Sequence, residues 1–286
     1  GRNKALIGKE VLSALIDATS EFIDNMKNLD VNIYLSGGET ADVGDIVRTA
    51  DVGFTAFARM KRSDLIVNRI RPGQVIVGLA SYGKASYETE YNSGIGSNGL
   101  TMARHELFGG DYVDRYPETF APQTNREYVY SGKGRLTDEI NIAGQSYPLG
   151  KLALSPTRTF LPVLKLIFKD FRASIHGIIH NTGGGHSKVL KYCDSPVQIV
   201  KDHLLDIPPI FEIISKNAGV DWEEMFKVFN MGTRLEIYTD EETALEIIRI
   251  SNLFDIEAGV IGRVEEVRNE VSRVVVSHED RKLIYQ

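Results

Sequence analysis

The stretch "SIHGIIHNTGGGHSKVLKY", residues 174–192, indicates that this chain mixes strands and helices around glycine-rich loops. Its β-branched residues predict a strand over 173–180, and residues 186–192 have the pattern of a short helix. The loop between them, residues 181–185, contains three consecutive glycines, which are costly in entropy to order. We therefore expect its backbone to approach a ligand, with a phosphate at the helix N-terminus as the candidate. A purely structural turn is the alternative.

Strands and helices alternate through the rest of the C-terminal two thirds of the chain. The predicted elements are a strand at 74–81, helices at 99–108 and 158–170, a strand at 196–200, helices at 208–218 and 221–228, a strand at 233–239, a helix at 240–252, and strands at 256–264 and 270–277. This alternation predicts α/β or α+β layers. Residues 109–155 are polar and weakly periodic, which indicates an insertion or a functional lid.

The N-terminal part is predicted to belong to a separate domain. An apolar stripe indicates an amphipathic helix over 4–28, and residues 31–36 and 51–60 have the pattern of strands. A charged stretch that ends in Pro72-Gly73 marks the boundary. We therefore expect an N-terminal domain over 1–62, a linker over 63–74 and a second domain over 75–286. Because the chain starts without Met, we expect that the natural polypeptide begins earlier and that the N-terminal domain is incomplete.

Composition excludes several classes of function. The chain has 286 residues, a net charge of −6 and 42% hydrophobic residues, which is ordinary for a globular protein. It has no basic stripe of the kind that binds nucleic acid, and no apolar run of the ~20 residues that span a bilayer. Cys193 is the only cysteine, so an intrachain disulfide is impossible and a reduced, cytoplasmic setting is expected.

The segment "YLSGGETADVGD", residues 34–45, combines two glycines with Glu39, Asp42 and Asp45. Glycines let backbone N–H groups approach a phosphate, but carboxylates repel it unless a divalent cation lies between them. Mg²⁺ is commonly held by one or two carboxylates together with substrate phosphates. The segment therefore predicts a Mg-nucleotide loop, although it lacks the Walker A pattern. A tight turn with solvated acids is the alternative.

Two further motifs are candidate ligand sites. In "NSGIGSNGLTMARHELF", residues 92–108, Ser97 and Asn98 are good capping residues for a helix whose N-terminus could bind an anion. In "FNMGTRL", residues 229–235, Asn230 is either a ligand or a structural residue of a turn. The spacing of the histidines around 176–186 matches no zinc motif, and no nucleophile elbow is present. No catalytic residue is assigned.

Five motifs in order, "GGETAD", "GSNGLTMAR", "SPTRTFLPVL", "IHNTGGG" and "FNMG", resemble those of the aminoimidazole ribonucleotide synthetases. These are the phosphoribosylformylglycinamidine cyclo-ligases of purine biosynthesis. The resemblance covers residues 31–277 and implies a two-domain fold of α/β layers whose N-terminal domain forms a homodimer. It implies ATP-driven ring closure of formylglycinamidine ribonucleotide, a small-molecule substrate, with Mg²⁺ as the metal.

The resemblance also implies site residues. The ATP- and phosphate-binding candidates are Gly37, Gly38, Glu39, Thr40 and Asp51, with Glu39 as the metal ligand. The substrate-binding candidates are Ser97, Asn98, Gly99, Arg158, Thr182, Gly183, Gly184, Gly185, Asn230 and Gly232.

The chain departs from the family pattern at several points. Gly96 stands where the family often has a histidine, residues 109–155 form a longer connection, and the upstream glycine loop that completes the ATP site has no counterpart. Two other functions are therefore considered. One is a small-molecule kinase of the same architecture, against which Glu39 and the Ser-Asn-Gly motif argue. The other is a non-catalytic module that binds a nucleotide.

Overall fold

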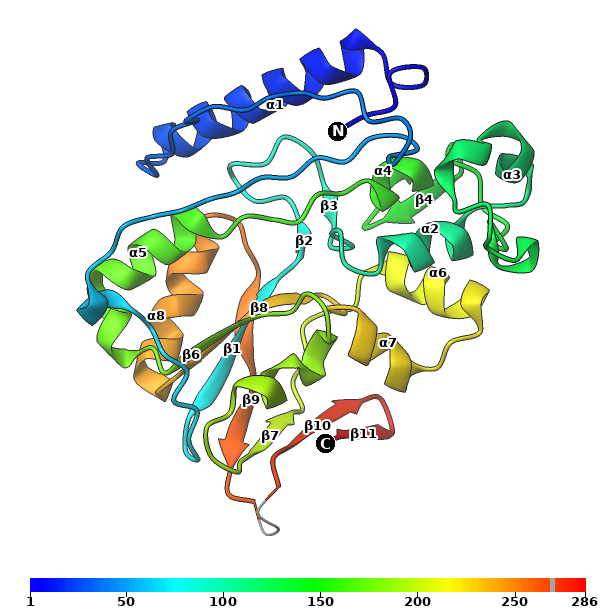
Figure 1. The fold of residues 1–286 in the computed structure, drawn as a ribbon. Coiled ribbons are helices and arrows are strands. Elements are labelled where there is room, and N and C mark those ends of the chain that lie inside the picture. The colour runs from blue at the N-terminus through cyan, green and yellow to red at the C-terminus, as the bar shows by residue number, and fades with distance from the viewer. Residues whose placement is uncertain (268–270) are drawn as a thin grey trace.

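A computed structural model describes residues 1–267 and 271–286, and its centre is a seven-stranded sheet with the order β11-β10-β7-β9-β1-β8-β6 (Figure 1). Its strands are β1 (Val75–Ala80), β6 (Gly177–His180), β7 (Gln198–Lys201), β8 (Thr233–Thr239), β9 (Ala258–Glu265), β10 (Arg273–His278) and β11 (Arg281–Tyr285). The β7–β10 pair is parallel, whereas β1 pairs antiparallel with both β8 and β9. The sheet is therefore mixed, and the predicted combination of strands and helices is confirmed.

Helices cover both faces of this sheet. The helices are α1 (Lys9–Asn28), α2 (Leu100–Leu107), α3 (Asp111–Arg115), α4 (Leu149–Ala153), α5 (Leu161–Phe171), α6 (Pro209–Ala218), α7 (Trp222–Val228) and α8 (Glu241–Asn252). Along β1, Val77 packs into the cluster under α5 and α8, and Ile76 packs into the cluster that includes α6 and α7. Because side chains alternate along a strand, β1 contributes to the core on both faces.

The weakly patterned segment 109–155 is folded. It contains α3, the 3₁₀ turns Pro117–Thr119 and Arg126–Tyr128, a hairpin of β4 (Glu139–Ile142) with β5 (Gln145–Pro148), and α4. Val113, Tyr130 and Leu152 are buried in the main core. A second small pair joins β2 (Tyr82–Gly83) to β3 (Asn92–Ser93), and sequence patterns predicted neither pair.

From residue 74 onward, most predicted elements are present within a few residues of their expected ends. The short helix predicted over 186–192 is present, and it is a 3₁₀ helix over Gly185–Tyr192. The N–H of Ser187 donates to the carbonyl of Gly184 at 3.0 Å, which is the three-residue spacing of a 3₁₀ turn. Such helices are short because their hydrogen-bond geometry is poorer.

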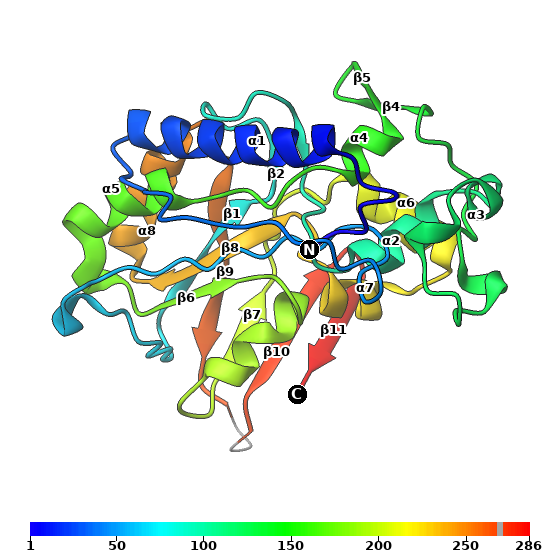
Figure 2. The same ribbon diagram turned by 45° about the horizontal axis from the view of Figure 1, so that its top comes forward.

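The predicted strands at 31–36 and 51–60 are wrong. Neither segment pairs with a strand within the part of the chain that the structure describes, and every residue of 51–60 is exposed. An alternating pattern makes a strand only when a neighbour accepts its backbone hydrogen bonds. In both views the coil of residues 29–60 runs beside α1, which lies outside the sheet (Figure 1, Figure 2). Among the residues described, no helix combines the length and apolar character needed to cross a membrane.

Candidate functional site

Three loops that are far apart in sequence meet at one place. They are residues 94–99 before α2, the glycine loop 181–185 after β6, and the turn 229–232 before β8. The side-chain amide of Asn230 donates to the carbonyl of Gly94 at 2.8 Å, and that of Asn98 donates to the carbonyl of Val228 at 2.9 Å. The glycine loop lies against both, because a Cβ on Gly183 would be 3.5 Å from Asn98 Oδ1 and Gly185 packs against the carbonyl oxygen of Phe229. The structure therefore brings together Ser97, Asn98, Gly99, Thr182, Gly183, Gly184, Gly185, Asn230 and Gly232, here called the three-loop site.

The glycines of the three-loop site differ in how closely other atoms surround them. At Gly99 a Cβ atom would lie only 2.5 Å from the ring of Phe229. At Gly185 and Gly232, which have positive φ, a Cβ atom would collide with backbone carbonyl oxygens, so close packing excludes any side chain. At Gly183 and Gly184, whose φ values are +58° and +96°, the nearest atoms would be 3.5 and 3.4 Å from a Cβ. A Cβ at these two positions would make ordinary contacts with Asn98 and Lys188, so the left-handed backbone, and not crowding, is what requires glycine.

A buried cation lies beneath the loop 94–99. Arg234 is 1% exposed, and its Nη2 donates to the carbonyls of Gly94 and Ile95 at 2.9 and 3.1 Å. Its Nε atom has no hydrogen-bond partner among the described residues. Burial, with a smaller effect from the charge of Arg158, lowers the pKa of Arg234 to about 10, so the side chain stays charged at neutral pH. This positive charge favours an anion at the adjoining loops.

Lys188 adds a second cation at the glycine loop. Its Nζ donates to the carbonyls of Thr182 and His180 at 2.7 and 3.1 Å, so the ammonium group bridges the start of the loop. Burial, and then the charges of Arg234 and Lys188, lower the pKa of His180 to about 4, so this histidine is neutral at pH 7. Arg234 and Lys188 thus supply the positive charge of the site.

Arg158, a predicted substrate-binding residue, is fully engaged by the protein. Its Nε and Nη2 donate to the carboxylate of Glu88 at 2.9 and 2.6 Å, and its Nη1 donates to the carbonyls of Ala80 and Tyr82. The remaining Nη2 proton goes to the carbonyl of Gly83. All five N–H groups are used in holding residues 80–88, so none is left for a substrate in this conformation.

The predicted ATP and metal residues do not join the three-loop site in this structure. Gly37, Gly38, Glu39, Thr40 and Asp51 are all exposed, and they lie on the coil that follows α1. A Cβ atom on Gly37 or Gly38 would meet nothing within 4 Å. No group of three or more His, Cys, Asp or Glu side chains suited to a metal ion occurs within residues 1–267 and 271–286. Their roles in binding ATP and Mg²⁺ therefore stay predictions.

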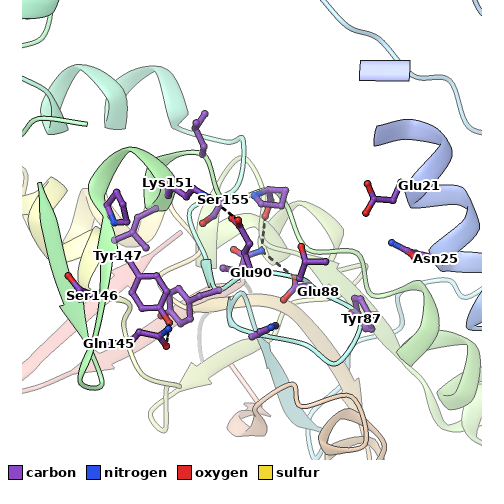
Figure 3. A pocket seen from close by; sticks show the side chains of 18 residues that line it. Glu21, Asn25, Tyr87, Glu88, Glu90, Gln145, Ser146, Tyr147, Lys151 and Ser155 are labelled. Carbon is purple, nitrogen blue, oxygen red and sulfur yellow. Dashed lines mark hydrogen bonds and ion pairs between the residues drawn. The ribbon is translucent and has the colours of Figure 1, made fainter. Parts of the chain in front are cut away.

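A cavity of about 980 Å³ lies between α1 and the main body (Figure 3). Glu21 and Asn25 of α1 face Tyr87, Glu88 and Glu90 across it, and Tyr147 and Lys151 form another wall. The cavity reaches Ser155 and Pro156, directly before Thr157, whose hydroxyl accepts from the N–H of Ser97 at 3.2 Å. It is therefore adjacent to the three-loop site. The acidic and aromatic run "SYETEY" (86–91) was the sequence signal for this wall, and sequence reasoning missed it.

Comparison with family models identifies the three-loop region. Residues 71–275 match the model described as "AIR synthase related protein, C-terminal domain". This range includes all three loops and every strand of the large sheet except the end of β10 and β11. The chain belongs to this family. This membership confirms the predicted resemblance and the AIR synthase-like α/β fold.

Several curated relatives of this AIR synthase-related chain are named phosphoribosylformylglycinamidine cyclo-ligase. The protein of Methanococcus vannielii is 36% identical over 262 residues, covering 89% of this chain and 64% of its own length. That of Methanocaldococcus jannaschii is 34% identical, covering 90% of this chain and 65% of its own length. The chain thus spans slightly less than two thirds of these relatives.

Two groups of solved structures are also similar to the AIR synthase-related chain. "T. maritima PurL complexed with FGAR" has a TM-score of 0.38 and 14% identity, covering 77% of this chain and 28% of its own. The E. coli hydrogenase maturation protein HypE has a TM-score of 0.38 and 14% identity, covering 76% of this chain and 50% of its own. These scores are too low to define the arrangement of this chain.

Proposed function

We propose that this chain is part of an enzyme that closes formylglycinamidine ribonucleotide to aminoimidazole ribonucleotide with ATP and Mg²⁺. The observation that carries the proposal is the three-loop site, where the left-handed glycine backbone of Gly183 and Gly184, the N-terminus of α2 and the charge of Arg234 lie together. That combination suits the phosphate of a ribonucleotide. The names of the relatives supply the reaction.

The residues of the three-loop site would bind and orient the substrate. The backbone of Gly183 and Gly184 would receive the phosphate, while Lys188 and Arg234 stabilise its charge from behind the loops. Asn98 and Asn230 hold the loops together through their amide groups, so their role is to keep the site in shape. ATP with Mg²⁺ would supply the phosphoryl group that turns the formyl oxygen into a leaving group.

The segment with Glu39 is proposed as the ATP side of the site. The backbone of Gly37 and Gly38 is accessible. Glu39 supplies one carboxylate, and proteins commonly bind Mg²⁺ through one or two carboxylates together with the phosphates of a nucleotide. These residues fit part of such a site and do not by themselves complete it. A homodimer is also proposed, because Phe54, Phe57 and other apolar side chains of this region are exposed.

The test is ADP release by the protein extended to the length of its relatives, with and without formylglycinamidine ribonucleotide. We expect release that requires both the substrate and Mg²⁺. Glu39→Gln should abolish this activity and weaken Mg-ATP binding. The matched control Glu242→Gln, at an exposed position of α8 outside the predicted loop, should leave both nearly unchanged. ADP release without dependence on the substrate would contradict the proposed reaction. Unchanged Mg²⁺ and ATP titrations in Glu39→Gln would contradict the metal assignment.

A further inference from the structure

Behind the glycine loop, one face of β8 carries polar side chains inside the protein. Leu235 and Ile237 pack into the core under α5 and α8, whereas Tyr238 belongs to the core on the opposite face. Because side chains alternate along a strand, Glu236 lies on the same face as Tyr238. Glu236 is 0% exposed, and so is Lys201 at the end of β7, which makes them the most deeply buried ion pair among the described residues.

This ion pair is connected to both ends of the glycine loop. Lys201 Nζ lies 2.6 Å from Glu236 Oε1. The same carboxylate oxygen accepts from the side-chain amide of Asn181, the first residue of the loop, at 2.7 Å. Lys201 Nζ also donates to the carbonyl of His186 at 2.8 Å, directly after the loop. Residues 182–185 are therefore tied down on each side by one member of the pair.

His186 extends the connection to the third loop. Its Nε2 lies 2.9 Å from the carbonyl oxygen of Asn230, which can only accept, so Nε2 carries the proton. Its Nδ1 is then an unprotonated nitrogen 3.6 Å from the carboxylate of Glu236. Burial, and then the charge of Lys201, lower the pKa of His186 to about 4, so the ring is neutral at pH 7. The ion pair thus stands at the centre of bonds that reach two of the three loops.

Stabilisation of the fold is not the main contribution expected from the buried pair of Lys201 and Glu236. Taking two charges out of water is costly, and replacement of a buried ion pair by apolar residues of similar volume is often neutral or stabilising. In contrast, the neighbouring loop with three consecutive glycines loses much conformational entropy when it is ordered. Hydrogen bonds that hold both ends of the loop order it in the free protein. Ligand binding then does not have to order the loop, so the affinity for the ligand is higher.

We propose that Lys201 and Glu236 are positioning residues that hold the glycine loop in its ligand-binding conformation. The inference rests on the proposed function, in which this loop receives the phosphate of the substrate. The pair touches no ligand itself. It acts through Asn181 and His186, whose backbone continues into Thr182 and Gly185.

The decisive variant removes both charges together. Lys201→Met/Glu236→Leu leaves no unpaired buried charge, so we expect a folded protein whose thermal midpoint stays within about 5 °C of the parent. We expect faster amide hydrogen exchange across residues 182–186 and at least a tenfold loss of affinity for ribose 5-phosphate, measured by calorimetric titration. Tyr238→Phe is the matched control, because it removes a 2.8 Å hydrogen bond to the same carboxylate without touching the loop. It should change neither readout more than twofold.

The two readouts separate the two proposals. If the parent protein fails to bind ribose 5-phosphate, the proposed function of the loop fails, and hydrogen exchange alone decides the positioning role. Unchanged exchange at 182–186 in the double variant overturns the positioning proposal, as does unchanged affinity in a parent that binds. Should the double variant fail to fold, Asn181→Ser breaks one of the two anchors and should speed exchange at Thr182 and Gly183 more than at Ser187. An equal increase of exchange at Thr182 and at Ser187 in this variant would also overturn the positioning proposal.

Discussion

The two glycine segments that the sequence singled out, at 37–38 and at 183–185, differ in what lies behind them. At Gly37 and Gly38 a Cβ atom would meet nothing within 4 Å, whereas at Gly185 it would collide with the carbonyl oxygens of Phe226 and Phe229. The second segment is also tied by Asn181 and Lys188 to surrounding strands and loops. Glycine thus lies in an exposed coil at 37–38 and in a closely packed loop at 183–185.

The surroundings of these segments show the same contrast. Before Ile70, the buried side chains are those of Ile23 and Met26, while from Ile70 onward two apolar clusters fill both faces of the sheet. Phe57 in the first region is 87% exposed. A glycine pattern alone therefore does not distinguish a preformed site from a loop without support, because the difference lies in long-range packing.

The largest loss of stability is expected from a substitution that disrupts the packed glycine loop. Gly185→Ala places a Cβ against backbone carbonyls at a φ of +46°, so we expect a loss of about 3 kcal/mol or more in the free energy of unfolding. Gly38→Ala, the matched change in the exposed segment, should cost less than about 0.5 kcal/mol. Urea denaturation of both variants measures this difference. Equal losses would contradict the contrast between the two segments.

The second prediction concerns pH. The pKa of His186 in the folded protein is lowered from 6.5 to about 4 by burial and then by Lys201. Between these pH values the unfolded chain binds a proton at His186 and the folded protein does not. The contribution of neutral His186 to the free energy of unfolding is therefore fully present above pH 6.5 and decreases as the pH drops toward 4. Denaturation at pH 7 and pH 5 checks this. His186→Gln should reduce the difference in the free energy of unfolding between the two pH values, and the part that remains comes from other groups, among them His180, whose pKa is also lowered to about 4. An unchanged slope in that variant would place the pH dependence elsewhere.

The third prediction separates ligand binding from stability at the open part of the glycine loop. Gly184→Val adds a β-branched side chain at a φ of +96°, where the nearest atom to a Cβ is 3.4 Å away. We expect a loss of about 1–2 kcal/mol in stability from the backbone strain. Affinity for ribose 5-phosphate should fall more than tenfold, measured by calorimetric titration. A collapse of stability with normal affinity in the remaining folded protein would show that the loop is structural.

The smallest effect on stability is expected in the N-terminal coil. Phe57→Ser changes an exposed side chain without packing partners to lose, so unfolding should shift by less than about 0.5 kcal/mol. Because it removes apolar surface, the variant should self-associate less than the parent, as measured by light scattering. A large loss of stability would mean that Phe57 is covered in solution, and unchanged association would exclude it from the interface.

Sequence patterns predicted the local structure of the C-terminal region well. Strand β8, predicted at 233–239, is present with the expected bounds. All seven of its residues are buried, so the strand packs on both of its faces. The strands predicted at 31–36 and 51–60 fail because a strand needs partners, and pairing is not a property of the segment itself. The hairpin β4–β5 was missed because each of its strands has only four residues, so the alternation of Ile140 and Ile142 with exposed polar residues is too short to stand out.

For the candidate site, the glycine runs in the sequence indicated which loops could approach a ligand. A run such as Gly183–Gly185 loses much conformational entropy when it is ordered, and a simple connection rarely uses one. Three features became visible in the folded chain alone: these loops meet, the carboxylate of Glu88 engages Arg158, and Lys201 pairs with Glu236, 35 residues away. The physical reason is that hydrogen bonds and ion pairs in a buried environment depend on which side chains the sheet order places together. Local sequence sets the conformations a loop can adopt, and its neighbours in space select among them.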